Sequence, residues 1–215
     1  MGEKGYSLGE EIANAVTHGV GAALAIAGLA VATVVAAKGD GGAWSVVPVT
    51  IYGSCLVLMF LFSTLYHSLP RGGGKRVFRI LDHEAIFLMI AGTYTPFALT
   101  TMRAEHPGWG WAIFGVIWGL AVCGMVFQAL FTGKYRYLAT GIYVAMGWLI
   151  VIALHPLKHT LSPEGMRWLW IGGLCYTLGA VVYLFKRVPY HHAVWHLAVL
   201  GGAICHFFGI LFHVA

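Results

Sequence analysis

Three histidines stand out because each falls near the end of a long apolar run, where an ionisable side chain is expensive to place. His192 and His196 are four residues apart, so in a helix they lie on one face about one turn apart, an arrangement suited to one metal ion. His67 supplies a third imidazole from a distant segment. Three protein nitrogens and one water form the usual ligand set of a catalytic zinc. The sequence therefore predicts a zinc site at these three histidines.

Two further polar residues accompany the histidines. Ser63 precedes His67 by four residues, and Asp82 opens the next apolar run at the same predicted depth. In a hydrolase, Asp82 would orient or deprotonate the attacking water, and Ser63 would donate a hydrogen bond to the developing oxyanion. Two alternatives stay open: Ser63 bonds a carbonyl of its own helix, and Asp82 is the fourth ligand of a structural zinc.

The first and last apolar runs carry additional polar residues. Glu11, Asn14 and His18 share one helical face and would close the site from a third side. Alternatively, Glu11 is only an acid near a helix start, where the helix dipole favours it. His206 and His213 follow His192 by fourteen and twenty-one residues and return to nearly the same face. They either line a proton or water path or, for His213, lie at the membrane interface.

These side chains need membrane helices to position them. Of the 215 residues, 59% are hydrophobic and 10% charged, which is too little polar surface to cover a soluble globule. About 20 apolar residues cross a bilayer core of roughly 30 Å. Seven runs meet this requirement, at residues 12–37, 44–68, 80–101, 109–131, 137–155, 167–186 and 190–213. Their short connections predict that residues 1–215 form a single, all-α integral membrane domain, a seven-transmembrane helical bundle.

The basic residues predict how this bundle is oriented, because short cytoplasmic loops are enriched in lysine and arginine. Nine of the thirteen fall on one side: Lys4, Arg71, Lys75, Arg76, Arg79, Lys134, Arg136, Lys186 and Arg187. The other side has Lys38, Arg103, Lys158 and Arg167. The N-terminus is therefore predicted to be cytoplasmic and the C-terminus exoplasmic, with the zinc site near the cytoplasmic face. The basic residues form no continuous face or tail, so we expect no nucleic-acid partner.

Four segments resemble a known family. They are EEIANAVTHGVGA at 10–22, STLYHS at 63–68, DHEAIFLMIAGTYTPF at 82–97 and HHAVWHLAVLGGAICHF at 191–207. They are similar to the bacterial hemolysin III proteins, which belong to the progestin and adipoQ receptor superfamily. Because the segments include both ends and the middle of the chain, the resemblance extends over nearly its full length.

The resemblance implies a seven-helix fold related to the adiponectin receptors, with the N-terminus inside and a zinc ion near the cytoplasmic face. The serine, histidine and aspartate of the family's second and third helices match Ser63, His67 and Asp82. Its paired histidines in the last helix match His192 and His196. For a bacterial member it also implies the inner (plasma) membrane as the location.

Two classes of function remain open. Eukaryotic relatives are linked to lipid-amide hydrolysis of the ceramidase kind, whereas bacterial members are named for haemolysis or associated with membrane homeostasis. The chain is therefore expected to be a zinc-dependent lipid amide hydrolase involved in lipid homeostasis. The alternative is a non-enzymatic sensor, receptor-like protein or pore with a structural zinc. Membrane lipids and a zinc ion are the expected partners, and the sequence does not reveal the oligomeric state.

Overall fold

Seven long apolar helices make up the computed structural model, which describes residues 6–185 and 189–215. Each is long and apolar enough to cross a membrane. They are α1 (Leu8–Lys38), α2 (Ala43–Ser68), α3 (Gly73–Pro96) continued to Glu105, α5 (Pro107–Phe131), α6 (Arg136–Trp148) continued to Thr160, α8 (Pro163–Leu184) and α9 (His191–His213). No strand occurs within the described ranges. The prediction of an all-α protein with seven membrane-spanning helices is confirmed.

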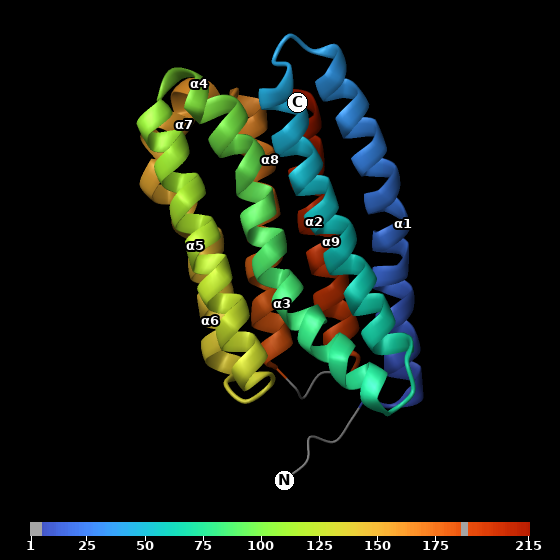
Figure 1. Cartoon of the computed structure of the whole chain (residues 1–215). Helices are drawn as coiled ribbons and strands as arrows, with labels where there is room; N and C mark the ends of the chain where they lie inside the picture. The colour runs from blue at the N-terminus through green and yellow to red at the C-terminus, as the bar shows by residue number, and fades with distance from the viewer. Residues whose placement is uncertain (1–5, 186–188) are drawn as a thin grey trace.

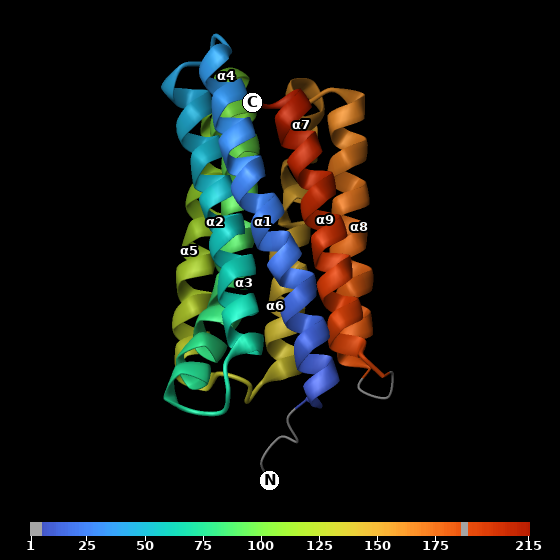
Figure 2. The same cartoon turned by 90° about the vertical axis from the view of Figure 1, so that its right-hand side faces the viewer.

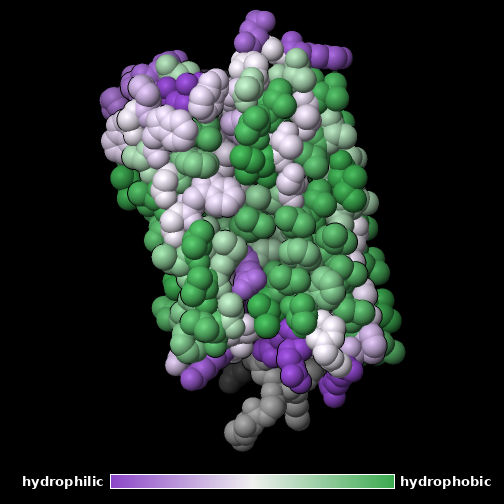
Figure 3. Space-filling view, viewed as in Figure 1, coloured by the Kyte–Doolittle hydropathy of each residue, from purple (hydrophilic) through white to green (hydrophobic). Residues whose placement is uncertain are grey.

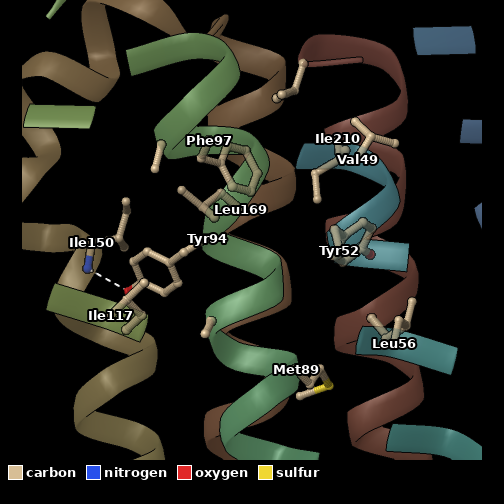
Figure 4. Close-up of a cluster of buried hydrophobic side chains, with 14 of the residues drawn as sticks. Val49, Tyr52, Leu56, Met89, Tyr94, Phe97, Ile117, Ile150, Leu169 and Ile210 are labelled. Atoms are coloured by element: carbon tan, nitrogen blue, oxygen red, sulfur yellow. Dashed lines mark hydrogen bonds between the residues drawn. The ribbon is translucent and has the colours of Figure 1, made fainter. Parts of the chain in front are cut away.

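Two of the seven helices change their winding partway. The third continues past Pro96 as a π-helix, η1 (Phe97–Met102), and ends in the short α4 (Arg103–Glu105). The fifth passes through a 3-10 segment, η2 (Leu149–Ala153), before α7 (Leu154–Thr160). Where the winding changes, some backbone N–H and C=O groups lose their usual partners in the helix and need other hydrogen-bond partners inside a membrane. The Tyr94 hydroxyl is one such partner, because it accepts a hydrogen bond from the Ile150 amide at 2.8 Å (Figure 4).

The helices run roughly parallel to one another, with the C-terminus at the end opposite the start of α1 (Figure 1). Helix α1 packs on α2, α2 on α3, α3 on α5, and α8 on α9. Helix α1 also contacts α9, so the first and last spans lie side by side (Figure 2). We call the end where α1, α3, α6 and α9 begin the N-side. Because α2 ends there, the N-side gathers the segments that carry the predicted site.

The outer surface has the character of a membrane-embedded protein. In the view of Figure 3, hydrophobic residues form a broad band, and hydrophilic residues gather toward the two ends. Leu130, Leu178, Phe212 and other large apolar side chains are exposed along the helices, which is unfavourable in water and favourable in lipid. Together with the seven apolar helices, this makes the chain an integral membrane protein.

The helix boundaries agree with the predicted spans, with one larger difference. The third helix begins at Gly73, seven residues before the predicted position 80. Its first turns contain Lys75, Arg76 and Arg79, so the helix extends beyond the apolar run. The predicted end of the sixth span at 186 lies outside the described residues, as do Lys4, Lys186 and Arg187. The six other residues of the larger basic group lie at or near the N-side: Arg71, Lys75, Arg76, Arg79, Lys134 and Arg136.

Candidate metal centre

Three histidines from two helices meet at the N-side. His67 lies in the last turn of α2, and His192 and His196 lie in the first two turns of α9. Each offers a ring nitrogen, and these atoms lie within 4.8 Å of one another. The side chains are buried, with exposures of 3%, 9% and 1%. The structure thus brings together the three residues that the sequence predicted as metal ligands.

The spacing of the three rings suits a single ion. Their centres are 5.1 Å apart for His67 and His192, 5.1 Å for His67 and His196, and 4.5 Å for His192 and His196. Two imidazoles that bind one tetrahedral zinc through Zn–N bonds of about 2.0 Å have ring centres roughly 5 Å apart. The three pairs fall close to this value.

For His67 and His196, hydrogen bonds determine which ring nitrogen has its lone pair available for a metal ion. The Nδ1–H of His67 donates to the carboxylate of Glu11, with 2.6 Å between Nδ1 and Oε2. The Nδ1–H of His196 donates to the backbone carbonyl of Asn14 at 3.1 Å. Since both Nδ1 atoms act as donors, the lone pairs are on Nε2. Metal-binding histidines typically donate their second ring N–H to a carboxylate or a carbonyl in this way.

Buried nitrogens without partners are the strongest sign that an ion belongs here. The Nε2 of His67 and both ring nitrogens of His192 are buried and have no hydrogen-bond partner within the described part of the chain. Leaving buried polar atoms unpaired is costly. A metal ion would take up the lone pairs of these imidazoles, so the residues fit the predicted ion.

Helix α1 supplies the hydrogen-bond partners of His67 and His196. The sequence left open whether Glu11 helps to close the site or is only an acid near a helix start. The Ser7 hydroxyl accepts a hydrogen bond from the Glu10 amide and caps the helix, while the main-chain N–H of Ser7 donates to the Glu10 carboxylate, so Glu10 serves the helix start. Glu11, one residue later, contacts His67 instead, and its other oxygen lies 2.9 Å from the Nζ of Lys75. Glu11 is therefore a partner of the histidine cluster and more than a residue at a favourable helix end.

His18 lies against the cluster without being part of the three-nitrogen set. Its ring stacks on that of His196, with 3.5 Å between centres and 9° between planes. The ring of Phe60 lies nearly perpendicular to that of His18, with 5.0 Å between centres. His18 thus holds the His196 ring in place by packing. Thr17 adds a hydroxyl 3.2 Å from the Nδ1 of His196.

A cavity of about 600 Å³ reaches the histidines. His192, His196 and Asp82 contribute to its wall. Its interior part is largely apolar and includes Met89, Ile90, Phe97, Val144, Ile150 and Leu169. Toward the N-side the wall contains the charged residues Glu10, Glu11, Arg71, Lys75, Arg79 and Arg136. The cavity therefore has a charged mouth and an apolar interior, and His192 and His196 lie on its wall.

The two residues predicted to take part in catalysis lie in different surroundings. Asp82 lines the cavity from α3, and its Oδ2 is 3.5 Å from the Nδ1 of His83. It is outside the set of described donors that lie close enough to share an ion. Ser63 is fully buried, and its hydroxyl makes no hydrogen bond with any described residue, including the carbonyls of its own helix. Their proposed roles remain predictions.

Two other histidines of α9 lie farther from the centre. His206 lines the interior of the cavity, and its Nε2–H donates to the carbonyl of Leu169 at 3.1 Å. His213 lies 2.8 Å from the Ser162 hydroxyl at the opposite end of the bundle. It is not part of the cavity wall as far as residues 6–185 and 189–215 define it. The sequence predicts that His192, His206 and His213 share one face of α9. That face therefore borders the cavity at His206 and contacts Ser162 at His213.

Comparison with known proteins identifies the family. The sequence profile described as "Haemolysin-III related" matches residues 6–207. Hemolysin-3 of Bacillus cereus is 45% identical over 205 residues, which cover 95% of this chain and 92% of that protein. The Hemolysin-3 homolog of Bacillus subtilis (strain 168) is 42% identical over 208 residues, covering 97% and 96%. The chain belongs to the haemolysin-III related family. The human Monocyte to macrophage differentiation factor is a more distant relative, 29% identical over 178 residues that cover 78% of this chain and 70% of that protein.

Some residues around the centre of this haemolysin-III related protein were not predicted. Lys75 reaches back to Glu11 and to the carbonyls of Tyr66 and Leu69, at 3.0 and 3.2 Å. The sequence shows Lys75 only as one of several loop cations, since nothing in its spacing points to a distant acid. The Asn14 carbonyl is a backbone atom and carries no sequence signal. Asn14 itself could be placed on the correct helix face, but its contact with α9 depends on how the helices pack.

Proposed function

We propose that this protein is a zinc-dependent hydrolase that cleaves amide bonds of membrane lipids. The observation that carries the proposal is the set of three closely grouped, buried imidazoles, two of which have their lone pairs fixed by outer hydrogen bonds. Two of the three, His192 and His196, lie at the wall of a largely apolar cavity. A closed bundle without such a cavity would have argued against a hydrolase. The three grouped histidines, and the cavity wall that His192 and His196 share with Asp82, are therefore the basis of the assignment.

Each residue has a defined task in this proposal. His67, His192 and His196 hold the ion, while Glu11 and the Asn14 carbonyl keep two of the rings in the required tautomer and orientation. The chemistry that zinc supplies at such a site is polarisation of the scissile carbonyl and activation of water. Asp82 accepts the proton of the attacking water and passes it to the leaving amine.

Ser63 is assigned a supporting task. It lies one turn before His67 on α2, and its buried hydroxyl has no partner among the described residues. A hydroxyl in this state is available to donate a hydrogen bond to an oxygen that gains charge during the reaction. We therefore assign it to stabilisation of the oxyanion.

The cavity matches a lipid amide in size and polarity. Binding sites for small molecules typically measure about 300–1,000 Å³, and this cavity has about 600 Å³. An acyl chain would occupy the apolar interior between α3, α6 and α8. The amide would then lie at the level of the histidines, near the N-side. We propose that this side faces the cytoplasm of a bacterial plasma membrane, with residues 1–215 acting as a single domain.

A non-enzymatic role for the ion is the competing proposal. The three histidines connect α2 to α9, and Glu11 adds α1, so an ion would join the first, second and last spans. A structural zinc normally has four protein ligands. Within the described residues three donors are grouped closely, which favours an ion with an open position. A structural zinc that ties the helices together, here called the structural clasp, therefore accounts for the number of grouped donors less well than a catalytic zinc does.

The decisive experiment compares turnover with zinc content. Purified protein in lipid nanodiscs is incubated with long-chain N-acyl amides, and released fatty acid is measured by mass spectrometry. Asp82→Asn should lower the rate by about 10²–10⁴-fold, the usual contribution of a general base, while retaining zinc. Glu84→Gln is the matched control, since it lies on the same helix and outside the cavity wall. Zinc-loaded wild type that releases no fatty acid from any acyl amide would favour the structural clasp.

A further inference from the structure

Three further histidines lie at the end of the bundle opposite the N-side. His155 and His159 belong to the short helix α7, and His106 lies directly before α5. Helices α4 and α7 are both found at this end (Figure 1). We call the three residues the distal histidines. Within the described ranges they are not part of the cavity wall, so they are separate from the candidate metal centre.

Two of the distal histidines are spaced for one ion. His155 and His159 are four residues apart on α7, and their ring centres are 4.8 Å apart. The pair at the metal centre, His192 and His196, has the same spacing in sequence and 4.5 Å between centres. Both distal rings are exposed, while Leu157 between them is buried. A helical pair of imidazoles on an exposed face can therefore take up a divalent ion from the medium.

His106 adds a third imidazole from another segment. Its ring centre is 6.4 Å from that of His159. Its Nε2 is buried and has no hydrogen-bond partner among the residues that the structure describes, which is unfavourable. A metal ion would give this nitrogen a partner. Two imidazoles on one tetrahedral ion have centres roughly 5 Å apart, so we expect the exposed His159 ring to turn toward His106 when an ion binds.

The main chain holds His106 in place. Its N–H donates to the carbonyl of Met102 at 2.7 Å, and its carbonyl accepts from the Gly110 amide at 3.0 Å. Gly110 allows α5 to begin close to the preceding segment, because a Cβ there would overlap the backbone of Ala98 and Arg103. Helix α7 packs on η1, which leads into α4. The distal histidines therefore extend from two backbone segments that already pack on the same element.

We propose that His106, His155 and His159 form a second metal site, for a divalent transition-metal ion that prefers imidazole, with Cu²⁺ bound most tightly. The site is independent of the proposed hydrolase. Because two of its ligands are exposed, its ion exchanges with the medium and is lost during purification without added metal. The bound ion would join α7 to the start of α5. Helix α7 continues η2, whose Ile150 lines the cavity, so the ion would also restrain this part of the cavity wall.

Titration of Cu²⁺ into the zinc-loaded protein in nanodiscs tests the proposal, with no polyhistidine tag on any component. Imidazole sites bind Cu²⁺ more tightly than other divalent ions of the first transition row. Its unpaired electron also reports nitrogen ligands in EPR spectra, which zinc does not. We expect about one Cu²⁺ per chain in addition to the zinc, with couplings to imidazole nitrogens. The temperature of thermal unfolding should rise, because an ion that binds only the folded state stabilises it.

Substitutions identify the ligands. His155→Gln and His159→Gln should each cause loss of the added Cu²⁺, and His106→Gln should weaken binding and remove one of the coupled nitrogens. His213→Gln is the matched control, since it lies at the same end of the bundle and its Nδ1 is already 2.8 Å from the Ser162 hydroxyl. This control should bind Cu²⁺ as wild type does. Retention of zinc at the metal centre shows that each variant is folded.

Several results would overturn the proposal. The first is the absence of any Cu²⁺ beyond the zinc-filled centre, and the second is Cu²⁺ that survives the His155→Gln and His159→Gln double substitution. Binding and nitrogen couplings that His106→Gln leaves unchanged would exclude the three-histidine site. Cu²⁺ that an equal concentration of free imidazole removes would be an adventitious ion only. Hydrolysis is not measured in this experiment, so its outcome does not depend on the proposed function.

Discussion

Replacing Glu11 by glutamine removes one negative charge from the outer partner of His67 and leaves the size of the side chain unchanged. The carboxylate accepts the Nδ1–H of His67 at 2.6 Å and contacts the Nζ of Lys75 at 2.9 Å. A glutamine cannot accept from both, because one of its two polar atoms is a donor. Loss of an outer carboxylate typically lowers metal affinity 10–100-fold, which corresponds to about 1.4–2.8 kcal/mol.

The assay is competition for zinc between the protein in nanodiscs and a chromogenic chelator of known affinity. Glu10→Gln is the matched control, since it removes the same charge one residue away and contacts Ser7 rather than His67. We expect Glu11→Gln to bind zinc 10–100-fold more weakly than wild type, and Glu10→Gln to bind as wild type does. Equal affinities for the two variants would refute the assignment of Glu11 as a partner of the centre.

Three other predictions concern the packing and orientation of the bundle. His18→Phe keeps a ring stacked on His196, so zinc content should stay at the wild-type level, and its loss would show that His18 is itself a ligand. A Cβ on Gly172 would overlap the ring of His206, whereas one on Gly173 meets nothing within 4 Å. Gly172→Ala should therefore destabilise the protein in thermal unfolding by about 1–3 kcal/mol, and Gly173→Ala should stabilise it by up to about 1 kcal/mol. If Gly172→Ala unfolds no more easily than Gly173→Ala, the close contact between α8 and α9 is wrong. Alkaline phosphatase fused after α9 should be active in the exoplasmic space, and inactive when fused between α5 and α6; the reverse pattern would invert the proposed orientation.

The spans could be predicted because each apolar run is as long as a bilayer requires, and lipid exposure leaves few alternatives to a helix. Most boundaries agree within a few residues. The start of the third helix was missed because Lys75, Arg76 and Arg79 interrupt the apolar pattern without breaking the helix. The π-helical and 3-10 segments around Phe97 and Ile150 arise from contacts between helices, such as the hydrogen bond of Tyr94, which hydropathy does not reveal.

The three histidines could be predicted for two reasons. The spacing of His192 and His196 fixes a shared helix face, and the alternation of spans places the end of α2 on the same side of the membrane as the start of α9. The outer partners depend on finer detail. Which oxygen meets Nδ1 of His196 is decided by the depth at which α1 packs on α9, and that depth carries no signal in the sequence.

The basic residues on the cavity wall illustrate the same limit. Arg71, Arg79 and Arg136 were recognised as part of a cytoplasmic excess of positive charge, which is a statement about topology. Only the packed structure places them on the wall of one cavity with the histidines. Charge counting along the chain predicts the side of the membrane, and tertiary contacts decide whether those charges face lipid headgroups or a ligand.

The most direct test of the central claim is the metal content of the purified protein, measured by mass spectrometry. The protein should be isolated without chelators and without a polyhistidine tag, so that neither removes nor adds metal. We predict about one zinc per chain in wild type, as one three-histidine centre requires, and loss of that zinc in both His67→Ala and His196→Ala. Wild type without bound metal, or variants that retain the full zinc content, would contradict the claim that these histidines form a zinc centre.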